Sequence, residues 1–148
     1  LVNNMRGIIW AMDSQNDSLR SLLAYIRQYA GTFLDDNGIA ATLSLPSDFP
    51  DHSLSSQYRH NVMLTVKECL NNILKHAEAT AVELKVDLGN QLHINIRDNG
   101  KGFEPVEHAG MGKGLRTTVK RMESVGGSIQ WHRNPEGGMT VTLLAPLP

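Results

Sequence analysis

The stretch VELKVDLGNQLHINIRD, residues 82–98, decides how this chain folds. Apolar and polar residues alternate on both sides of Gly89-Asn90, a pattern typical of two half-buried strands joined by a tight turn. The alternation continues through Ile96 to Asp98, so both side chains project from the same inward face of the second strand. We therefore predict a hairpin whose second strand ends on an inward-facing carboxylate.

Helical patterns lie on both sides of this hairpin. Apolar residues at helical spacing predict a long helix over 55–77 and a shorter one that begins near Leu115. The mixture of helices and hairpins predicts an α+β fold, with three main helices on one face of a mixed, mainly antiparallel sheet. The other expected elements are a helix capped by Asp17 and ended by Gly38, and a strand over 39–45. A second hairpin is expected at 129–131 and 139–143, across a turn at 134–138 that ends with Gly137-Gly138.

The composition excludes several classes of protein. The 148 residues suffice for one domain, and 14 Lys and Arg against 15 Asp and Glu give a net charge of -1. This balance leaves no basic excess to bind a nucleic-acid backbone. The single cysteine, Cys69, excludes an internal disulfide. No apolar run approaches the roughly 18 residues of a membrane span. We therefore expect no nucleic-acid partner and no direct membrane contact.

One side of the 55–77 helix carries four polar groups that suit a phosphate-bearing ligand. They form a stripe beside the apolar side of the helix, where a ligand held between the helix and a loop would lie. The alternative is an ordinary solvated shoulder, and Lys67, Asn71 and Glu78 are expected on the solvent side. The stripe consists of Glu68, Asn72, Lys75 and His76.

Asp98 and the glycines that follow it form a second candidate feature. An ionised carboxylate on an inward face is costly unless donors reach it, and an amine-bearing ligand or ordered water would supply them. Gly100 and Gly102 permit close approach of the backbone. The alternative is an Asx turn in which Asp98-Asn99-Gly100 merely ends the strand.

A third feature is the glycine-rich run GMGKG, residues 110–114, which leads into the helix expected from Leu115. Free N–H groups at a helix N-terminus suit phosphate. The run matches neither a Walker loop nor a dinucleotide-binding fingerprint. By itself it is equally compatible with a mobile loop over 99–114.

Together the three features resemble the ATP-binding boxes of bacterial sensor histidine kinases. Residues 68–76, ECLNNILKH, are similar to the N box, residues 98–103, DNGKGF, to the G1 box, and residues 112–115, GKGL, to the G2 box. The short loop between the last two boxes resembles the subgroup with short ATP lids. The resemblance implies the Bergerat fold shared with gyrase, Hsp90 and MutL, with the catalytic and ATP-binding domain at 15–148.

The resemblance also implies roles in binding ATP and Mg²⁺. Asn72 would hold Mg²⁺, and Asp98 would accept a hydrogen bond from adenine N6. Glu68 would be the acid/base residue that polarises the acceptor imidazole or a metal-bound water. Lys113 stands where the subgroup often has a small polar residue, which leaves open a phosphate contact or a solvated loop charge. The remaining implied nucleotide-binding residues are Lys75, His76, Gly100, Gly102, Gly112, Gly114, Leu115 and, near adenine-side water, Thr140.

As a whole the resemblance implies a histidine kinase that transfers the γ-phosphoryl of ATP to a histidine on an upstream dimerisation hairpin. Residues 1–14 resemble only the end of that hairpin, an N-terminal helical remnant without the acceptor histidine. The implied partners are the acceptor helix of the same protein, dimeric at full length, and a response regulator receiver domain. The implied location is the cytoplasmic part of a membrane-anchored bacterial sensor. Another ATPase of this fold and a non-catalytic nucleotide-binding module remain the alternatives.

Overall fold

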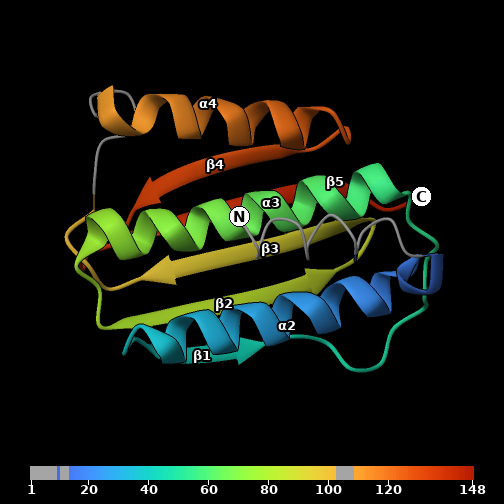
Figure 1. The fold of residues 1–148 in the computed structure, drawn as a ribbon, viewed down its shortest axis with the longest axis horizontal. Helices are drawn as coiled ribbons and strands as arrows, with labels where there is room; N and C mark the ends of the chain where they lie inside the picture. The colour runs from blue at the N-terminus through green and yellow to red at the C-terminus, as the bar shows by residue number, and fades with distance from the viewer. Residues whose placement is uncertain (1–9, 11–13, 103–108) are drawn as a thin grey trace.

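A computed structural model of the chain describes residue 10, residues 14–102 and residues 109–148. It consists of a five-stranded sheet with helices across one face (Figure 1). This architecture confirms the predicted two-layer α+β sandwich. The elements in chain order are η1 (Ser14–Asn16), α2 (Leu19–Asp36), β1 (Ala40–Ser44), α3 (Ser56–Asn72), the π-helix η2 (Ile73–Ala77), β2 (Ala81–Leu88), β3 (Gln91–Asp98), α4 (Ala109–Glu123), β4 (Ser128–Arg133) and β5 (Met139–Pro146).

The sheet has the strand order β1-β2-β3-β5-β4. β1 and β2 run parallel, and the other neighbouring strands are antiparallel. The β2–β3 hairpin is present as predicted, and its register places Leu84 opposite Ile96 and Val82 opposite Asp98. The mixed, mainly antiparallel sheet is therefore as expected.

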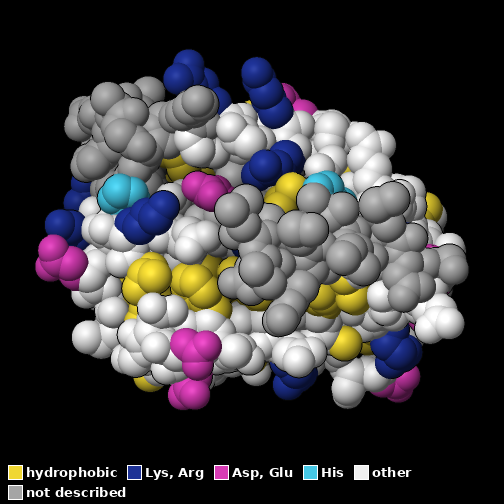
Figure 2. Space-filling model, in the orientation of Figure 1, with side chains coloured by type: hydrophobic (Ala, Val, Ile, Leu, Met, Phe, Trp, Pro, Cys, Tyr) yellow, Lys and Arg dark blue, Asp and Glu magenta, His cyan; other side chains and the backbone are white. Residues whose placement is uncertain are grey.

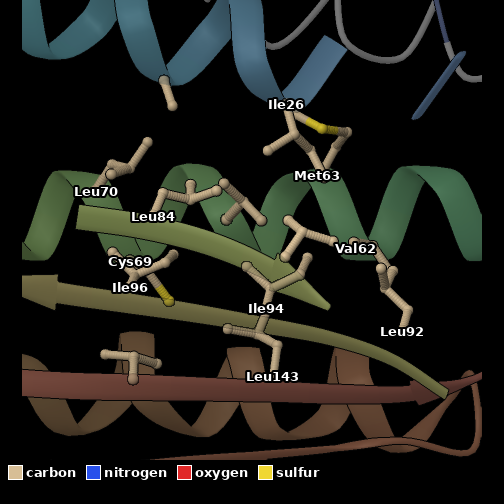
Figure 3. Close-up of a cluster of buried hydrophobic side chains, with 14 of the residues drawn as sticks. Ile26, Val62, Met63, Cys69, Leu70, Leu84, Leu92, Ile94, Ile96 and Leu143 are labelled. Atoms are coloured by element: carbon tan, nitrogen blue, oxygen red, sulfur yellow. The ribbon is translucent and has the colours of Figure 1, made fainter. Parts of the chain in front are cut away.

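The core lies between the inward face of the sheet and the helices (Figure 3). Alternate residues of β2 and β3, such as Leu84 and Ile94, are fully buried against α3 residues such as Leu70. Each such side chain contributes about 1.5–3 kcal/mol when it is buried. Cys69 belongs to this core, and burial raises the pKa of its thiol to about 12, as expected of an inert cysteine.

The first helix begins one residue later than expected. Ser18, not Asp17, is the N-cap of α2, because its hydroxyl accepts a hydrogen bond from the backbone N–H of Ser21. The adjacent Asp17 instead accepts a backbone hydrogen bond from Leu54. Gly38 follows the helix with φ of 69°, which agrees with the predicted glycine ending.

The long helix expected over 55–77 is present but changes type near its end. Ser55 caps α3, which is α-helical to Asn72, and the chain then continues as the π-helix η2. The segment ends at Glu78, which has φ of 53° in the left-handed region. π-Helical turns are mostly short segments within α-helices and are frequent at functional sites. This one carries Lys75 and His76.

The prediction for Lys67 was wrong. Lys67 was expected in solvent, but it is 5% exposed, and its ammonium lies over the rings of Tyr25 and Tyr29 of α2. Burial lowers the pKa of this lysine. The helical spacing of apolar residues identified the side of α3 that faces the sheet. It could not show that α2 covers the adjacent side of α3, where Lys67 lies.

The beginning of α4 was also placed wrongly. The helix starts at Ala109, not near Leu115, so Gly112 and Gly114 lie within its first turns instead of in a loop ahead of it. A phosphate cradle at the N-terminus of a helix that starts at 115 is therefore absent from this conformation of the described segment. The helix ends at Glu123, and Gly126 follows with φ of 78°.

The predicted N-terminal helical remnant lies almost entirely outside the described residues. Only Trp10 and Ser14 of the stretch 1–14 are described. Within the described parts of the chain, none of the helices has the length and apolarity needed to cross a bilayer.

Candidate functional site

Three segments distant in the sequence meet at one end of the sheet: the end of α3 with η2, the residues after β3, and the beginning of α4. The backbone N–H of Lys101 donates to the carbonyl of Ala77 over 2.8 Å, which ties the segment after β3 to η2. A Cβ on Gly114 would lie 2.9 Å from Oε1 of Glu68, so the first turns of α4 pack directly on α3. The three motifs that the sequence singled out are therefore neighbours in space.

Asp98 is the most deeply buried carboxylate of this region, at 3% exposed. Its Oδ1 accepts a hydrogen bond from the backbone N–H of Gly100 over 2.8 Å, and the backbone N–H of Met139 also donates to it. Burial nevertheless raises the pKa of Asp98, because desolvation outweighs these two hydrogen bonds. Asp98 thus forms the Asx turn, and its carboxylate is a buried hydrogen-bond acceptor.

Gly100 is required by the close approach of η2. A Cβ at this position would overlap the carbonyl oxygen of Ala77, so no larger residue fits without movement of the backbone. Asn99 joins the same junction, since its Oδ1 accepts from the backbone N–H groups of Thr80 and Ala81. The turn after β3 is therefore fixed from two sides, and Asp98 is held at a defined place.

The turn between β4 and β5 contributes to the site in a way that the sequence analysis missed. Gly138 has φ of 82°, and a Cβ there would lie 3.0 Å from Oδ1 of Asp98 and overlap its carbonyl oxygen. Gly138, the last residue of the turn, and Met139, the first residue of β5, thus lie next to Asp98. The Gly137-Gly138 pair was the signal in the sequence, but it was interpreted only as a turn.

The polar stripe of α3 and η2 lies beside this turn. Glu68, Asn72 and His76 are half-buried, and Lys75 is exposed. The space-filling view shows acidic, basic and histidine side chains together over the part of α3 that leads into η2 (Figure 2). A carboxylate, an amide and two basic groups therefore lie together along the end of α3 and η2.

The glycine-rich run is part of helix α4, not of an open loop, and it contacts Glu68 of α3. Gly114 is the glycine in contact with that carboxylate, and Leu115 is buried against Met139 and Trp131. Gly112 lies two residues, about half a helical turn, toward the N-terminus of α4. The side chain of Lys113 and the residues 103–108 are outside the described part of the structure, so the two alternatives for Lys113 remain.

Thr140 does not join the other predicted site residues. The register pairs it with Arg97 on the outward face of the sheet, whereas Asp98 projects toward the helices. Its hydroxyl donates to Oδ1 of Asn134 over 2.7 Å. Met139, one position earlier, is the β5 residue that faces Asp98.

The described residues offer a metal ion only an incomplete set of ligands. No group of three or more His, Cys, Asp or Glu side chains suited to a metal occurs among them. Asn72 and Glu68 are four residues apart on one helix and supply one amide and one carboxylate oxygen. This donor set fits a Mg²⁺ ion that takes its other ligands from phosphate and water.

The sequence model described as histidine kinase-, DNA gyrase B-, and HSP90-like ATPase matches residues 58–148, which is more than half of the chain. The chain belongs to this ATPase family. All of the site residues discussed above lie within the matched range, from Glu68 at the beginning to Thr140 near the end.

Among curated proteins, sensor histidine kinases are similar to this ATPase domain. The histidine-protein kinase/phosphatase DegS of Brevibacillus brevis is 28% identical over 130 residues, which cover 85% of this chain and 32% of DegS. The histidine-protein kinase/phosphatase UhpB of Salmonella typhimurium is 33% identical over 113 residues, which cover 76% of this chain and 21% of UhpB. The chain thus spans about a third or less of these relatives.

Solved structures agree with the family assignment. The ATP-binding domain of PrrB from Mycobacterium tuberculosis superposes with a TM-score of 0.65 at 26% identity, covering 86% of this chain and 92% of that domain. The histidine kinase domain of a blue-light activated kinase from Erythrobacter litoralis EL346 gives a TM-score of 0.69 at 21% identity, covering 85% of this chain and 61% of that one. The latter shows the fold alone.

Proposed function

We propose that this ATPase-family domain binds Mg²⁺-ATP and donates the γ-phosphoryl to a histidine on a dimerisation hairpin of the same protein. The observation that carries the proposal is the buried carboxylate of Asp98, which is 3% exposed and is held by the N–H of Gly100 in contact with η2. An acceptor of this kind selects an exocyclic amine, which adenine has and guanine lacks at the equivalent position. The similarity of the chain to the histidine kinases DegS and UhpB supports a histidine as the residue that accepts the phosphoryl group.

Most of the proposed site residues would bind ATP, and one, Glu68, would act on the phosphoryl acceptor. Asp98 would accept from adenine N6 while Gly100 and Gly102 let the base approach the backbone. Lys75 is exposed and free to reach toward phosphate, and His76 would border the nucleotide. Gly112 and Gly114 would contribute backbone N–H groups to the phosphates once the beginning of α4 has moved away from Glu68, because a helical N–H beyond the first turn is already bonded.

Glu68 is the residue proposed to act on the acceptor. Its carboxylate would accept the N–H of the incoming imidazole, which raises the nucleophilicity of the other ring nitrogen. That nitrogen forms the bond to the γ-phosphorus while the bond to the β–γ bridging oxygen breaks and ADP leaves. Positioning and charge neutralisation supply most of the acceleration in such transfers.

A bound Mg²⁺ ion would neutralise phosphate charge and is proposed to be held by Asn72 through its amide oxygen, with Glu68 as a further contact through water. The two side chains are half-buried at the last turn of α3, next to the phosphate end of the site. The protein would then supply few ligands and the nucleotide the others, which is the usual arrangement for Mg²⁺ at phosphates.

The wider context follows from the same proposal. The receiver domain of a response regulator would accept the phosphoryl group from the histidine, and the domain would act in the cytoplasm as part of a membrane-anchored sensor. The protein would be dimeric through the upstream hairpin. The net charge of -1 is in line with a protein, and not a nucleic acid, as partner.

The test of nucleotide binding compares ATP with GTP by isothermal titration calorimetry in Mg²⁺. ATP should bind in the micromolar to millimolar range typical of substrates. GTP should bind at least about tenfold more weakly, because its O6 would face the Asp98 carboxylate without a proton between them. Equal affinities would remove Asp98 from base recognition.

Glu68→Gln separates binding from transfer. The amide keeps the shape of the side chain, so ATP affinity should be unchanged, whereas phosphorylation of the hairpin histidine should fall about a hundredfold or more. An unaltered rate of histidine phosphorylation would show that Glu68 is not the acid/base residue. The unsubstituted protein distinguishes the alternatives. If it hydrolyses ATP but phosphorylates no histidine, another ATPase of this family is favoured. If it binds ATP without any turnover, a nucleotide-binding module is favoured.

A further inference from the structure

Two buried cations on α3 have no part in the proposed nucleotide site. Arg59 is 3% exposed and Lys67 is 5% exposed, and they are the only buried basic side chains among the described residues. Burial of a charge is costly unless hydrogen bonds compensate for it. The groups that contact Arg59 and Lys67 therefore show which segments of the chain are held against this side of α3.

Arg59 joins α3 to the segment of chain that leads into the domain. Its Nη1 donates to the carbonyl of Asn16 over 2.7 Å, and its Nε donates to the carbonyl of Leu54 over 3.3 Å. The guanidinium also lies 5.8 Å from the centre of the Trp10 ring. The side chain of Asn16 in turn donates to the carbonyl of Trp10 over 3.2 Å.

Tyr25 of α2 packs against Trp10. The two rings have centroids 4.5 Å apart at an interplanar angle of 59°. Tyr25 also contacts Lys67, whose ammonium donates to the Tyr25 hydroxyl over 3.4 Å and lies 5.3 Å from the ring centre. Trp10, which is partly buried, thus contacts both α2 and α3. Figure 2 shows hydrophobic side chains between these two helices.

The backbone beyond Asn16 is fixed in the same way. Ser18 forms an isolated antiparallel bridge with Ser53, and the N–H of Leu19 donates to His52 over 2.8 Å. The N–H of Leu54 donates to Asp17 over 2.6 Å. The chain between η1 and α2 is therefore pinned to the residues immediately before α3, in the manner of a short strand pair rather than a free linker.

We propose that Trp10, Asn16, Tyr25 and Arg59, here called the N-terminal clamp, are positioning residues that couple the chain upstream of Trp10 to α3. The proposal rests on the proposed function, because the upstream chain would carry the acceptor histidine. Arg59 and Glu68 lie on one helix, about 14 Å apart along its axis. A displacement of about 1 Å at a reacting group can reduce a rate by about a hundredfold, so a rigid joint at this distance matters for transfer.

The joint itself can be tested in this chain by the fluorescence of Trp10. The chain has two tryptophans, and Trp131→Phe leaves Trp10 as the only one. Its anisotropy should decay with the tumbling of the whole domain, without a fast component. Arg59→Lys keeps the charge but cannot donate along two directions from one planar group, so a fast component should appear and acrylamide should quench Trp10 more strongly.

Arg20→Lys is the matched control. Arg20 also donates to two carbonyl oxygens, those of Ser47 and Phe49, and its guanidinium lies 4.5 Å from the Phe49 ring centre. Its contacts are thus of the same kind as those of Arg59 but do not include Trp10 or α3. The control should leave Trp10 as immobile as in the parent. Fast motion of Trp10 in the parent, or equal effects of the two lysine substitutions, would overturn the proposal of a clamp.

The functional part of the proposal is tested in the kinase that carries the acceptor hairpin upstream of this chain. Arg59→Lys should leave KM for ATP unchanged and reduce kcat for histidine phosphorylation at least tenfold, since the nucleotide site is intact and only the approach of the acceptor is altered. Arg20→Lys should change neither. A purely structural role of Arg59 would change both parameters or neither, and either result would overturn the coupling. If the parent does not bind ATP, the proposed function fails, but the fluorescence of Trp10 still decides whether the clamp exists.

Discussion

Replacement of Asp98 by Asn should weaken ATP binding and at the same time stabilise the nucleotide-free domain. In the folded chain Asp98 is 3% exposed, and burial raises its pKa despite hydrogen bonds from Gly100 and Met139. A raised pKa means that the fold favours the neutral form of this group. Asn is a neutral group of the same shape, so Asp98→Asn removes an unfavourable charge while it places an NH2 group where the adenine amine would donate.

The magnitude for binding follows from the loss of a hydrogen bond to a charged acceptor. Such a bond contributes about 1.5–3 kcal/mol, which corresponds to a Kd for ATP about 10- to 150-fold higher. Stability should change in the opposite direction at neutral pH, with a higher melting temperature for the variant. Opposite signs for binding and stability distinguish this effect from simple damage to the fold.

The pH dependence of stability has a definite sign. Because the folded-state pKa of Asp98 lies above its ordinary value of 3.8, the stability associated with the group is fully present below that value and is lost as pH rises through the folded-state pKa. The advantage of the variant in melting temperature should therefore be greatest at neutral pH and should vanish when Asp98 is protonated.

The assays are calorimetric titration with Mg²⁺-ATP at neutral pH and thermal unfolding between neutral pH and about pH 3. Asp87→Asn is the matched control, because Asp87 is an exposed carboxylate on the same hairpin. It should alter neither binding nor this pH dependence. ATP affinity equal to that of the parent, or a variant less stable than the parent at neutral pH, would refute the reasoning about Asp98.

Three further outcomes are expected. Gly100→Ala should lower the free energy of unfolding by about 1–3 kcal/mol in chemical denaturation, because the new Cβ would overlap the Ala77 carbonyl. Gly89→Ala is the control and should be neutral, because a Cβ there meets no atom within 4 Å. Equal stabilities of the two variants would contradict the close packing at Gly100. Asn72→Ala should weaken the part of ATP affinity that depends on Mg²⁺ and leave the affinity in EDTA unchanged, and an undiminished Mg²⁺ effect would exclude Asn72 as a ligand. The chain incubated with radiolabelled ATP should remain unlabelled, because none of its six histidines resembles the acceptor, and a label stable in alkali on one of them would show that the acceptor has been misplaced.

Patterns that depend on neighbouring residues could be interpreted from the sequence. The alternation in β2 and β3 predicted the hairpin and the inward direction of Asp98, because successive side chains of a strand point to opposite faces. Helical spacing likewise predicted the buried stripe of α3. The polar stripe and the glycine motifs were found by the same local logic and by their resemblance to known ATP-binding boxes.

Features that depend on contacts between distant segments could not be predicted in this way. A helical wheel assumes 3.6 residues per turn, so it could not indicate the π-helix in which Lys75 and His76 lie. Thr140 was assigned by its place after a glycine pair, and only the pairing of β3 with β5 shows that Met139 faces Asp98 instead.

The sequence by itself determined the elements, the inward carboxylate of Asp98 and the order of the three motifs, because each of these is encoded within a few consecutive residues. The tertiary structure alone decided that Arg59 and Lys67 are buried and that Gly138 is required beside Asp98. Whether a charged side chain meets solvent or a tyrosine ring depends on which helix packs beside it. That packing is set by the whole core, so no local pattern in the sequence reveals it.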